Sequence, residues 1–309
     1  MYTLIGNKDT FQKYVWDICN EEKPRNENAN SYHRKQSKLN CRYIDHLEPF
    51  LVIGPFPVEV RLRAPKLVIY HDFFTEKEMK WMIDYSTPLL TNVRNSSTPI
   101  FTKERSSDGV TKAVQTWFTD IIYQFDEMHG LKSTENASSQ NDKHTPHAPY
   151  RYLVKNFLML DVSHRIELAT QLNVTKWISS TMYQTTYYGL AGMVNVHLDA
   201  FGYEKGRALT KDVKHLAYSG DIIATFMGWL KEPSAGGYTV FPSTKIALQP
   251  RKGSAAFWVN LSSCHHKDTF TEHAGCPVLK GSKWILNKWI HSFDQWNIFP
   301  CHLTEYENI

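Results

Sequence analysis

The chain has no long hydrophobic run and little excess charge of either sign. No stretch of about 18 apolar residues occurs in it, so the sequence predicts no membrane span. The first residues have neither a basic n-region nor an apolar h-region, so they do not predict a signal peptide. The net charge is only +4, which does not argue for nucleic acid as a partner.

The composition is that of a folded protein with a substantial core. Hydrophobic residues make up 42% of the 309 residues, enough to build one. The many aromatic residues favour a β-rich interior. The number of cysteines is odd, so at least one is unpaired in a monomer, and their spacing alone also allows five independent thiols. They are Cys19, Cys41, Cys264, Cys276 and Cys301.

Helical patterns dominate the first half of the chain. Thr75 and Glu78 form a capping-box pattern that predicts the start of a helix. Apolar residues recur at helical spacing in three further segments. These predicted helices cover residues 9–19, 113–129 and about 162–173.

Strand patterns dominate from about residue 178 onward, and this order of elements predicts an α+β protein. Helices followed by many strands predict a double-stranded β-helix (jelly roll) core flanked by N-terminal helices. Asn260 begins an Asn-X-Ser sequon inside a predicted core strand, so it is a poor glycan site. The predicted strands are 52–57, 66–70, 181–188, 194–199, 221–230, 238–241, 254–261 and 283–291.

Four polar residues in this strand-rich half indicate chemistry. His197 and Asp199 lie two residues apart on a predicted strand, so their side chains point to the same face. A distant histidine such as His273 can complete a facial triad of two histidines and one carboxylate, which is typical of non-haem Fe(II) oxygenases. Lys283 follows ten residues later and can bind the far carboxylate of an oxo-acid.

Plainer interpretations of the same residues remain open at this point. A lone His-X-Asp pair can be a surface histidine with a solvated carboxylate. His265 and His266 could be considered as a metal pair, but adjacent strand residues point to opposite faces. Lys283 and His291 share one face of the last strand, which is either a polar pocket or a solvent-exposed face.

Several longer motifs resemble one family, the catalytic domain of the collagen prolyl 4-hydroxylase α subunit, within the 2-oxoglutarate/Fe(II) dioxygenase superfamily. The similarity runs from about residue 39 to residue 301. Its motifs occur in the same order as in the family, which is far more specific than a His-X-Asp pair. They are LNCRY at 39–43, YR at 150–151, SAGGYTVFP at 234–242, AFWVNL at 256–261, HAGCPVL at 273–279 and GSKWILNKWIH at 281–291.

The resemblance implies roles for individual residues. It implies an enzyme that hydroxylates peptidyl proline at C4, with Fe(2+), 2-oxoglutarate and O₂, and with L-ascorbate keeping the iron reduced. The products besides hydroxyproline are succinate and CO₂. The implied iron ligands are His197, Asp199 and His273. Lys283 would bind the C5 carboxylate of 2-oxoglutarate, with Tyr188 in the pocket and His291 as a further catalytic residue near the co-substrate.

The resemblance also implies features beyond the iron site. It implies disulfides Cys19–Cys41 and Cys276–Cys301, with Cys264 free, and therefore an oxidising compartment such as the endoplasmic reticulum lumen. The implied partners are a collagen-like, proline-containing polypeptide and a disulfide-isomerase-like β subunit.

The expected domains are an N-terminal extension (1–60), a dioxygenase domain (61–301) with a surface insertion at about 95–149, and a tail (302–309). This sequence departs from the family pattern at 193–196 (MVNV) and at Phe157, where the family has tryptophan. The altered run at 193–196 and the insertion motivate one alternative, which is the same chemistry on another protein or a small molecule. A second alternative is a non-catalytic peptide-binding subunit, although the intact ligand set and Lys283 argue against it.

Overall fold

The computed structural model describes Val15, Ile18 and Cys19 together with residues 41–46, 48–92, 110–118, 148–204, 207–208, 219–262 and 266–298. The helices are α2 (Pro49–Ile53), α3 (Glu76–Ser86), α5 (Ala148–Thr170) and the 3-10 turns η2 (Thr87–Leu89), η4 (Pro242–Thr244) and η5 (Thr269–Thr271). The strands of the first half are β1 (Cys41–Ile44), β2 (Phe56–Leu62), β3 (Leu67–Tyr70), β4 (Thr91–Asn92), β5 (Val110–Phe118), β6 (Tyr183–His197), β7 (Tyr203–Glu204) and β8 (Arg207–Ala208). The remaining strands are β9 (Ile222–Lys231), β10 (Ala235–Gly236), β11 (Thr239–Phe241), β12 (Ile246–Leu248), β13 (Ala255–Val259), β14 (His273–Gly275), β15 (Val278–Lys280) and β16 (Lys283–His291).

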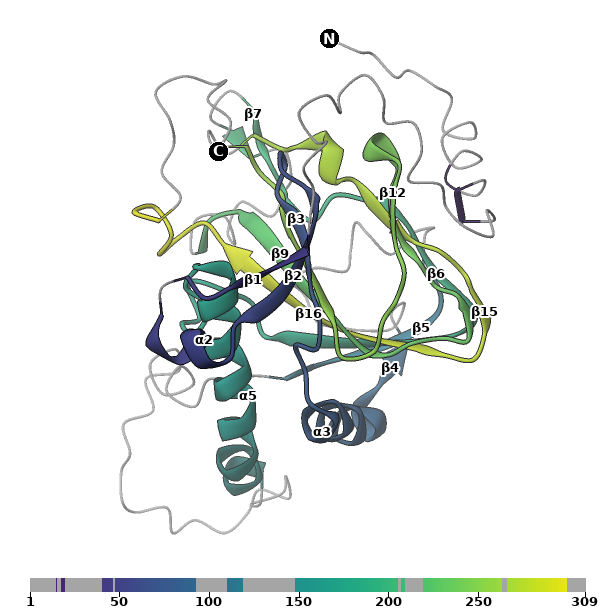
Figure 1. The fold of residues 1–309 in the computed structure, drawn as a ribbon. Helices are drawn as coiled ribbons and strands as arrows, with labels where there is room; N and C mark the ends of the chain where they lie inside the picture. Colours follow the sequence, from purple (N-terminus) through teal and green to yellow (C-terminus); the bar gives the residue numbers. More distant parts are fainter. Residues whose placement is uncertain are drawn as a thin grey trace.

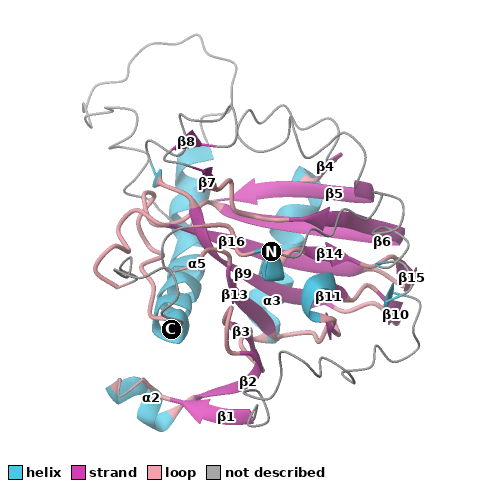
Figure 2. Ribbon diagram, turned by 90° about the horizontal axis from the view of Figure 1, so that it is seen from above, coloured by secondary structure: helices cyan, strands magenta, loops and turns pink. Residues whose placement is uncertain are grey.

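The main sheet is antiparallel and strongly curled (Figures 1 and 2). Its order is β1-β2-β3-β13-β9-β16-β6-β14-β11-β12, with β5 pairing the other edge of β6. β6 changes partners along its length: Gln184–Tyr188 pair with β16, and Val194 and His197 pair with β14. β6 therefore joins two facing walls of the curled sheet, one with β3, β13, β9 and β16 and the other with β14, β11 and β12. This arrangement confirms the predicted jelly roll in an α+β protein.

Two hydrophobic layers hold this fold together. One fills the inside of the curl and includes Trp229, Phe241 and Trp258. The other lies between the outer side of the sheet and the helices, where Met82 of α3 and Ile166 of α5 are fully buried. Each large apolar side chain buried in this way stabilises the fold by about 1.5–3 kcal/mol.

The predicted capping box is present at the start of α3. Glu78 donates its backbone N–H to the Thr75 hydroxyl, and Thr75 donates its backbone N–H to the Glu78 carboxylate. The same carboxylate accepts two hydrogen bonds from Arg165 of α5, at 2.7 and 3.0 Å. One residue of the sequence motif therefore both caps α3 and joins it to α5. The helix predicted at 162–173 is also confirmed, although α5 begins earlier, at Ala148.

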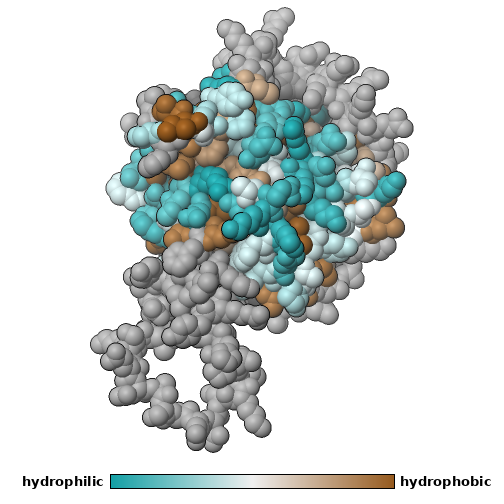
Figure 3. Space-filling view, turned by 60° about the horizontal axis from the view of Figure 1, so that its bottom comes forward, coloured by the Kyte–Doolittle hydropathy of each residue, from teal (hydrophilic) through white to brown (hydrophobic). Residues whose placement is uncertain are grey.

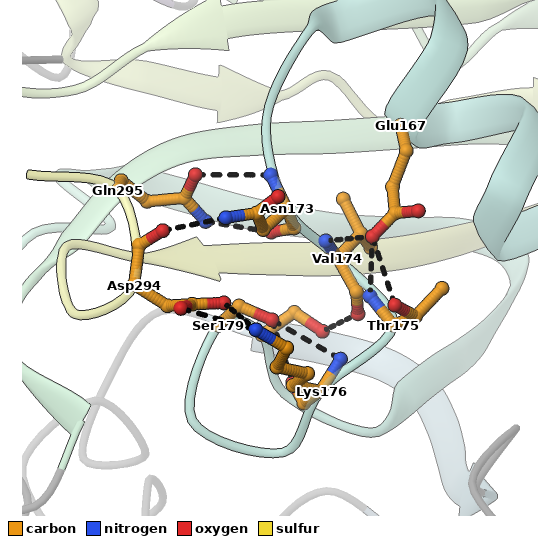
Figure 4. A network of polar contacts seen from close by, with 9 residues as sticks. Glu167, Asn173, Val174, Thr175, Lys176, Ser179, Asp294 and Gln295 are labelled. Carbon is orange, nitrogen blue, oxygen red and sulfur yellow. Dashed lines mark hydrogen bonds and ion pairs between the residues drawn. The ribbon is translucent and has the colours of Figure 1, made fainter. Parts of the chain in front are cut away.

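Polar contacts fix the end of α5 against the segment that follows β16 (Figure 4). The Glu167 carboxylate accepts hydrogen bonds from the backbone N–H groups of Val174 and Thr175. Asn173 and Gln295 exchange hydrogen bonds of 2.9 and 2.6 Å. The strand that carries Lys283 is thus held at its far end as well as by its two neighbours in the sheet.

On the face drawn in Figure 3, hydrophilic residues predominate and hydrophobic ones form small separate areas. Among the described residues, no helix combines the length and apolarity needed to cross a membrane.

The helix predicted at 113–129 is wrong in its first part, where residues 110–118 form β5. Val114, Trp117 and Phe118 fit helical spacing, but they are also good strand formers. β5 pairs with β6 along nearly its whole length, and this tertiary pairing overrides the local pattern. Residues 119–129 lie outside the described part of the chain. β5 also falls inside the segment predicted as an insertion, so part of that segment belongs to the main sheet.

Two other boundaries differ from the prediction. Residues 49–53 form α2, and β2 begins only at Phe56, so the strand predicted at 52–57 is only partly right. β1 lies before the domain boundary predicted at residue 61, β2 crosses it, and both join the main sheet, which starts at residue 41. The helix predicted at 9–19 lies mostly outside the described residues.

The disulfide pairing differs from the one that the resemblance implied. Cys19 is bonded to Cys276, and Cys41 is a free, exposed thiol, so Cys19–Cys41 and Cys276–Cys301 are wrong. Ile18 packs with Val240 and Ala274 in a small hydrophobic cluster, and this packing brings Cys19 to β14. The pairing thus depends on a long-range contact rather than on sequence spacing. Cys264 and Cys301 lie outside the described residues.

Candidate metal centre and co-substrate pocket

Three of the polar residues singled out in the sequence, two histidines and one aspartate, lie together where β6 pairs with β14. His197 ends β6, Asp199 follows two residues later, and His273 begins β14. The register of β14 on β6 places His273 directly opposite His197. One potential ligand atom from each of the three side chains lies within 4.8 Å of the others. The structure thus brings together three residues that are up to 76 positions apart in the sequence.

Both histidines are held with the same ring nitrogen available. His197 Nδ1 lies 2.8 Å from the carbonyl oxygen of Asn195, and His273 Nδ1 lies 3.0 Å from that of Thr271. Because a carbonyl only accepts, Nδ1 carries the proton in each ring, and Nε2 keeps its lone pair. Each Nε2 lies 3.7 Å from an Asp199 carboxylate oxygen.

This donor set fits a divalent transition metal. Two imidazole nitrogens and one carboxylate oxygen are the ligands of the facial triad that holds non-haem Fe(II). With ligand bonds of about 2.1 Å, neighbouring ligand atoms of an octahedral site are about 3 Å apart. The His–Asp separations are 3.7 Å and all three ligand atoms lie within 4.8 Å of one another, so the side chains would move inward around a bound ion. Asp199 is 1% exposed, so the carboxylate is shielded from bulk water.

Lys283 is the first residue of β16, and its side chain is buried, with 4% of the residue exposed. Its Nζ lies 3.4 Å from the Thr239 hydroxyl and 5.7 Å from the centre of the Tyr188 ring. Within the described part of the chain it has no ion-pair partner, and burial lowers its pKa to about 7. An uncompensated buried cation is costly, and the carboxylate of a bound ligand would remove that cost.

The two remaining candidates occupy different positions relative to Lys283. Tyr188 pairs with Lys283 across β6 and β16 and is 8% exposed, so it lies beside Lys283 in the buried interior. His291 stands at the opposite end of β16 and is also 8% exposed. The solvent-exposed alternative for the last strand is therefore wrong. Of the rival pair, His266 is exposed and His265 lies outside the described residues.

Some residues around these side chains were not singled out in the sequence. Thr239 lies in the motif at 234–242, but its position beside Lys283 follows only from the fold. Thr225 donates a hydrogen bond to Asp199, and an isolated threonine in an apolar strand gives no signal of this. Asn260 is fully buried, in agreement with the prediction of a poor glycan site.

Comparison with known proteins agrees with this geometry. Residues 183–291 match the model of the 2OG-Fe(II) oxygenase superfamily. The chain is 29% identical to human prolyl 4-hydroxylase subunit alpha-1 over 275 residues, which are 89% of this chain and 43% of that subunit. It is 29% identical to chicken prolyl 4-hydroxylase subunit alpha-2 over 92% of this chain and 45% of that subunit.

A solved structure gives a further similarity. The viral collagen prolyl hydroxylase of Paramecium bursaria Chlorella virus-1 aligns with 73% of this chain and 95% of its own, at 20% identity and a TM-score of 0.43. The chain spans less than half the length of the prolyl 4-hydroxylase subunits that it matches. Residues 183–291 therefore resemble the 2OG-Fe(II) oxygenase superfamily, and the chain resembles prolyl 4-hydroxylase α subunits over most of its length.

Proposed function

We propose that the protein hydroxylates peptidyl proline at C4, using 2-oxoglutarate and O₂ and releasing succinate and CO₂. The observation that carries this proposal is the pairing of a His-Asp-His cluster with a buried lysine that has no ion-pair partner in the described structure. A metal ion accounts for the first, and a dicarboxylate co-substrate accounts for the second. The similarity to prolyl 4-hydroxylase subunits supports proline as the target.

The side chains have distinct tasks in this proposal. His197, Asp199 and His273 hold Fe(II), which supplies the oxidative chemistry when bound. Lys283 anchors the C5 carboxylate of 2-oxoglutarate through a charge-assisted hydrogen bond and so fixes its orientation. Tyr188 walls the pocket beside Lys283 and excludes water. Excluding water protects the reaction from side reactions in a site of this kind.

Other parts of the proposal rest on the resemblance alone. They are the catalytic role of His291, the use of L-ascorbate, a collagen-like polypeptide substrate, a disulfide-isomerase-like β subunit and a location in the endoplasmic reticulum lumen. The disulfide between Cys19 and Cys276 supports an oxidising compartment.

The test is an assay of the purified protein with Fe(II), 2-oxoglutarate and ascorbate. A collagen-like proline-rich peptide and an unrelated proline-containing peptide are supplied separately, and succinate and peptide mass are measured. We expect succinate together with the mass gain of one oxygen atom on proline of the collagen-like peptide. His197→Ala is expected to remove both signals, whereas Lys283→Ala is expected mainly to raise the KM for 2-oxoglutarate.

The other outcomes separate the alternatives. Oxidation of the unrelated peptide alone would indicate a dioxygenase with another substrate. Failure of the wild-type protein to bind iron would indicate a non-catalytic peptide-binding subunit. A wild-type protein that binds iron but makes no more succinate than His197→Ala would contradict the enzyme proposal.

A further inference from the structure

A chain of hydrogen bonds runs from the Asp199 carboxylate into the core. The Thr225 hydroxyl of β9 donates to Asp199 Oδ2 at 2.7 Å. The Asn260 side-chain amide, just after β13, donates to the Thr225 hydroxyl at 2.9 Å. Thr225 is 1% exposed and Asn260 is 0% exposed, so water does not compete for these bonds.

The chemistry of the groups fixes the direction of this chain. An ionised carboxylate only accepts hydrogen bonds, so the single hydroxyl proton of Thr225 points to Asp199. The Thr225 oxygen then has lone pairs left, and the Asn260 NH₂ group fills one of them. Asn260 thus holds the threonine hydroxyl in the orientation in which it donates to Asp199.

The backbone of Asn260 begins a second chain that ends at His273. The Asn260 carbonyl oxygen accepts from Asp268 N–H at 3.0 Å, and the Asp268 carbonyl oxygen accepts from the Thr271 hydroxyl at 2.7 Å. The Thr271 carbonyl oxygen accepts from His273 Nδ1 at 3.0 Å. Asn260 is therefore linked to two of the three residues of the His-Asp-His cluster.

We infer that Asn260 and Thr225 are positioning residues that fix Asp199, and through the loop at 268–271 also His273, for metal binding. This inference rests on the proposed function only in taking the cluster as a metal site. An asparagine buried only to end a strand would be expected to use both side-chain polar atoms. Among the described residues Asn260 Oδ1 has no hydrogen-bond partner, so the side chain forms its bond through the NH₂ group, which orients Thr225.

The experiment compares Co(II) binding by variants of the 309-residue chain, measured by visible absorption, with their free energies of unfolding in urea. Thr225→Val removes the hydroxyl at constant shape and is expected to weaken Co(II) binding on the order of 10–100-fold. Thr225→Ser restores the hydroxyl and should bind Co(II) nearly as well as the wild-type protein. Asn260→Ala interrupts the chain one step further out and should weaken binding in the same direction and alter the Co(II) spectrum.

Thr185→Val is the matched control. Thr185 is another fully buried strand threonine, and its hydroxyl donates to Ser86 at 2.7 Å, on the helix side of the sheet. It should lose stability as Thr225→Val does and keep wild-type Co(II) affinity. Equal Co(II) affinity in wild type, Thr225→Val and Asn260→Ala would overturn the inference, as would an equal loss in Thr185→Val. Because the probe is the metal alone, this result is independent of whether any peptide is hydroxylated.

Discussion

Replacing Lys283 by methionine is expected to make the ligand-free protein more stable near neutral pH. The Lys283 side chain is 4% exposed, and its one described polar contact is the Thr239 hydroxyl at 3.4 Å. Burial lowers the pKa of Lys283 from 10.5 to about 7. At about 1.4 kcal/mol for each pKa unit, the difference between these two values corresponds to about 5 kcal/mol of lost stability.

The pH dependence gives this prediction its sign. In the unfolded chain Lys283 binds its proton below pH 10.5, whereas in the folded protein it binds the proton only below about pH 7. Between these values unfolding takes up a proton, so the free energy of unfolding rises with pH. The destabilisation caused by burying Lys283 has its full size below about pH 7 and disappears as the pH rises to 10.5. Methionine does not titrate, so its advantage should shrink by about 3 kcal/mol between about pH 6 and about pH 9.

Urea unfolding of both proteins near pH 6 and near pH 9, without metal or co-substrate, measures this difference. Other titrating groups are common to both proteins and cancel in the comparison. Tyr188 does not interfere, because burial raises its pKa above the usual 10 and keeps it neutral in this range. A stability difference that is the same at both pH values would refute the reasoning, because Lys283 would then keep its ordinary pKa in the folded protein.

Two further predictions concern the rest of the fold. Serine at both Cys19 and Cys276 is expected to lower the free energy of unfolding by about 2–5 kcal/mol, because their disulfide joins residues 257 positions apart; an unchanged urea midpoint in non-reducing buffer would contradict it. Glu78→Ala should lower the free energy of unfolding by about 1–3 kcal/mol, because Glu78 both caps α3 and accepts from Arg165. Lys80→Ala, on the exposed face of α3, is its control in thermal unfolding and should change little.

Local signals in the sequence predicted the elements that depend on local chemistry. The capping box at Thr75 needs only residues three apart, and it marks the start of α3. The alternation of the last strand predicted that Lys283 and His291 share one face, and the burial of both side chains shows that this face is the inner one. Residues 113–118 were predicted as helix, although they belong to β5, because their apolar residues fit both periods. Only its pairing with β6 decides between them.

Contacts across the sheet could not be read from the sequence in the same way. Asn260 in an apolar strand is an unusual residue, but its partner Thr225 lies on the neighbouring strand, 35 positions away. The Cys19–Cys276 disulfide likewise depends on where the N-terminal segment packs. The sequence therefore singled out the residues of the His-Asp-His cluster and Lys283, but not Thr225 and Asn260, which hold Asp199 through hydrogen bonds.

β6 positions both the His-Asp-His cluster and the residues beside Lys283. Its first half pairs with β16 and sets Tyr188 opposite Lys283. Its second half pairs with β14 and sets His197 opposite His273. Between the two halves Ala191 has a positive φ of 60°, where the strand passes from one wall of the jelly roll to the other. Under the proposed function, 2-oxoglutarate would therefore reach from the cluster to Lys283 between groups that one continuous strand positions.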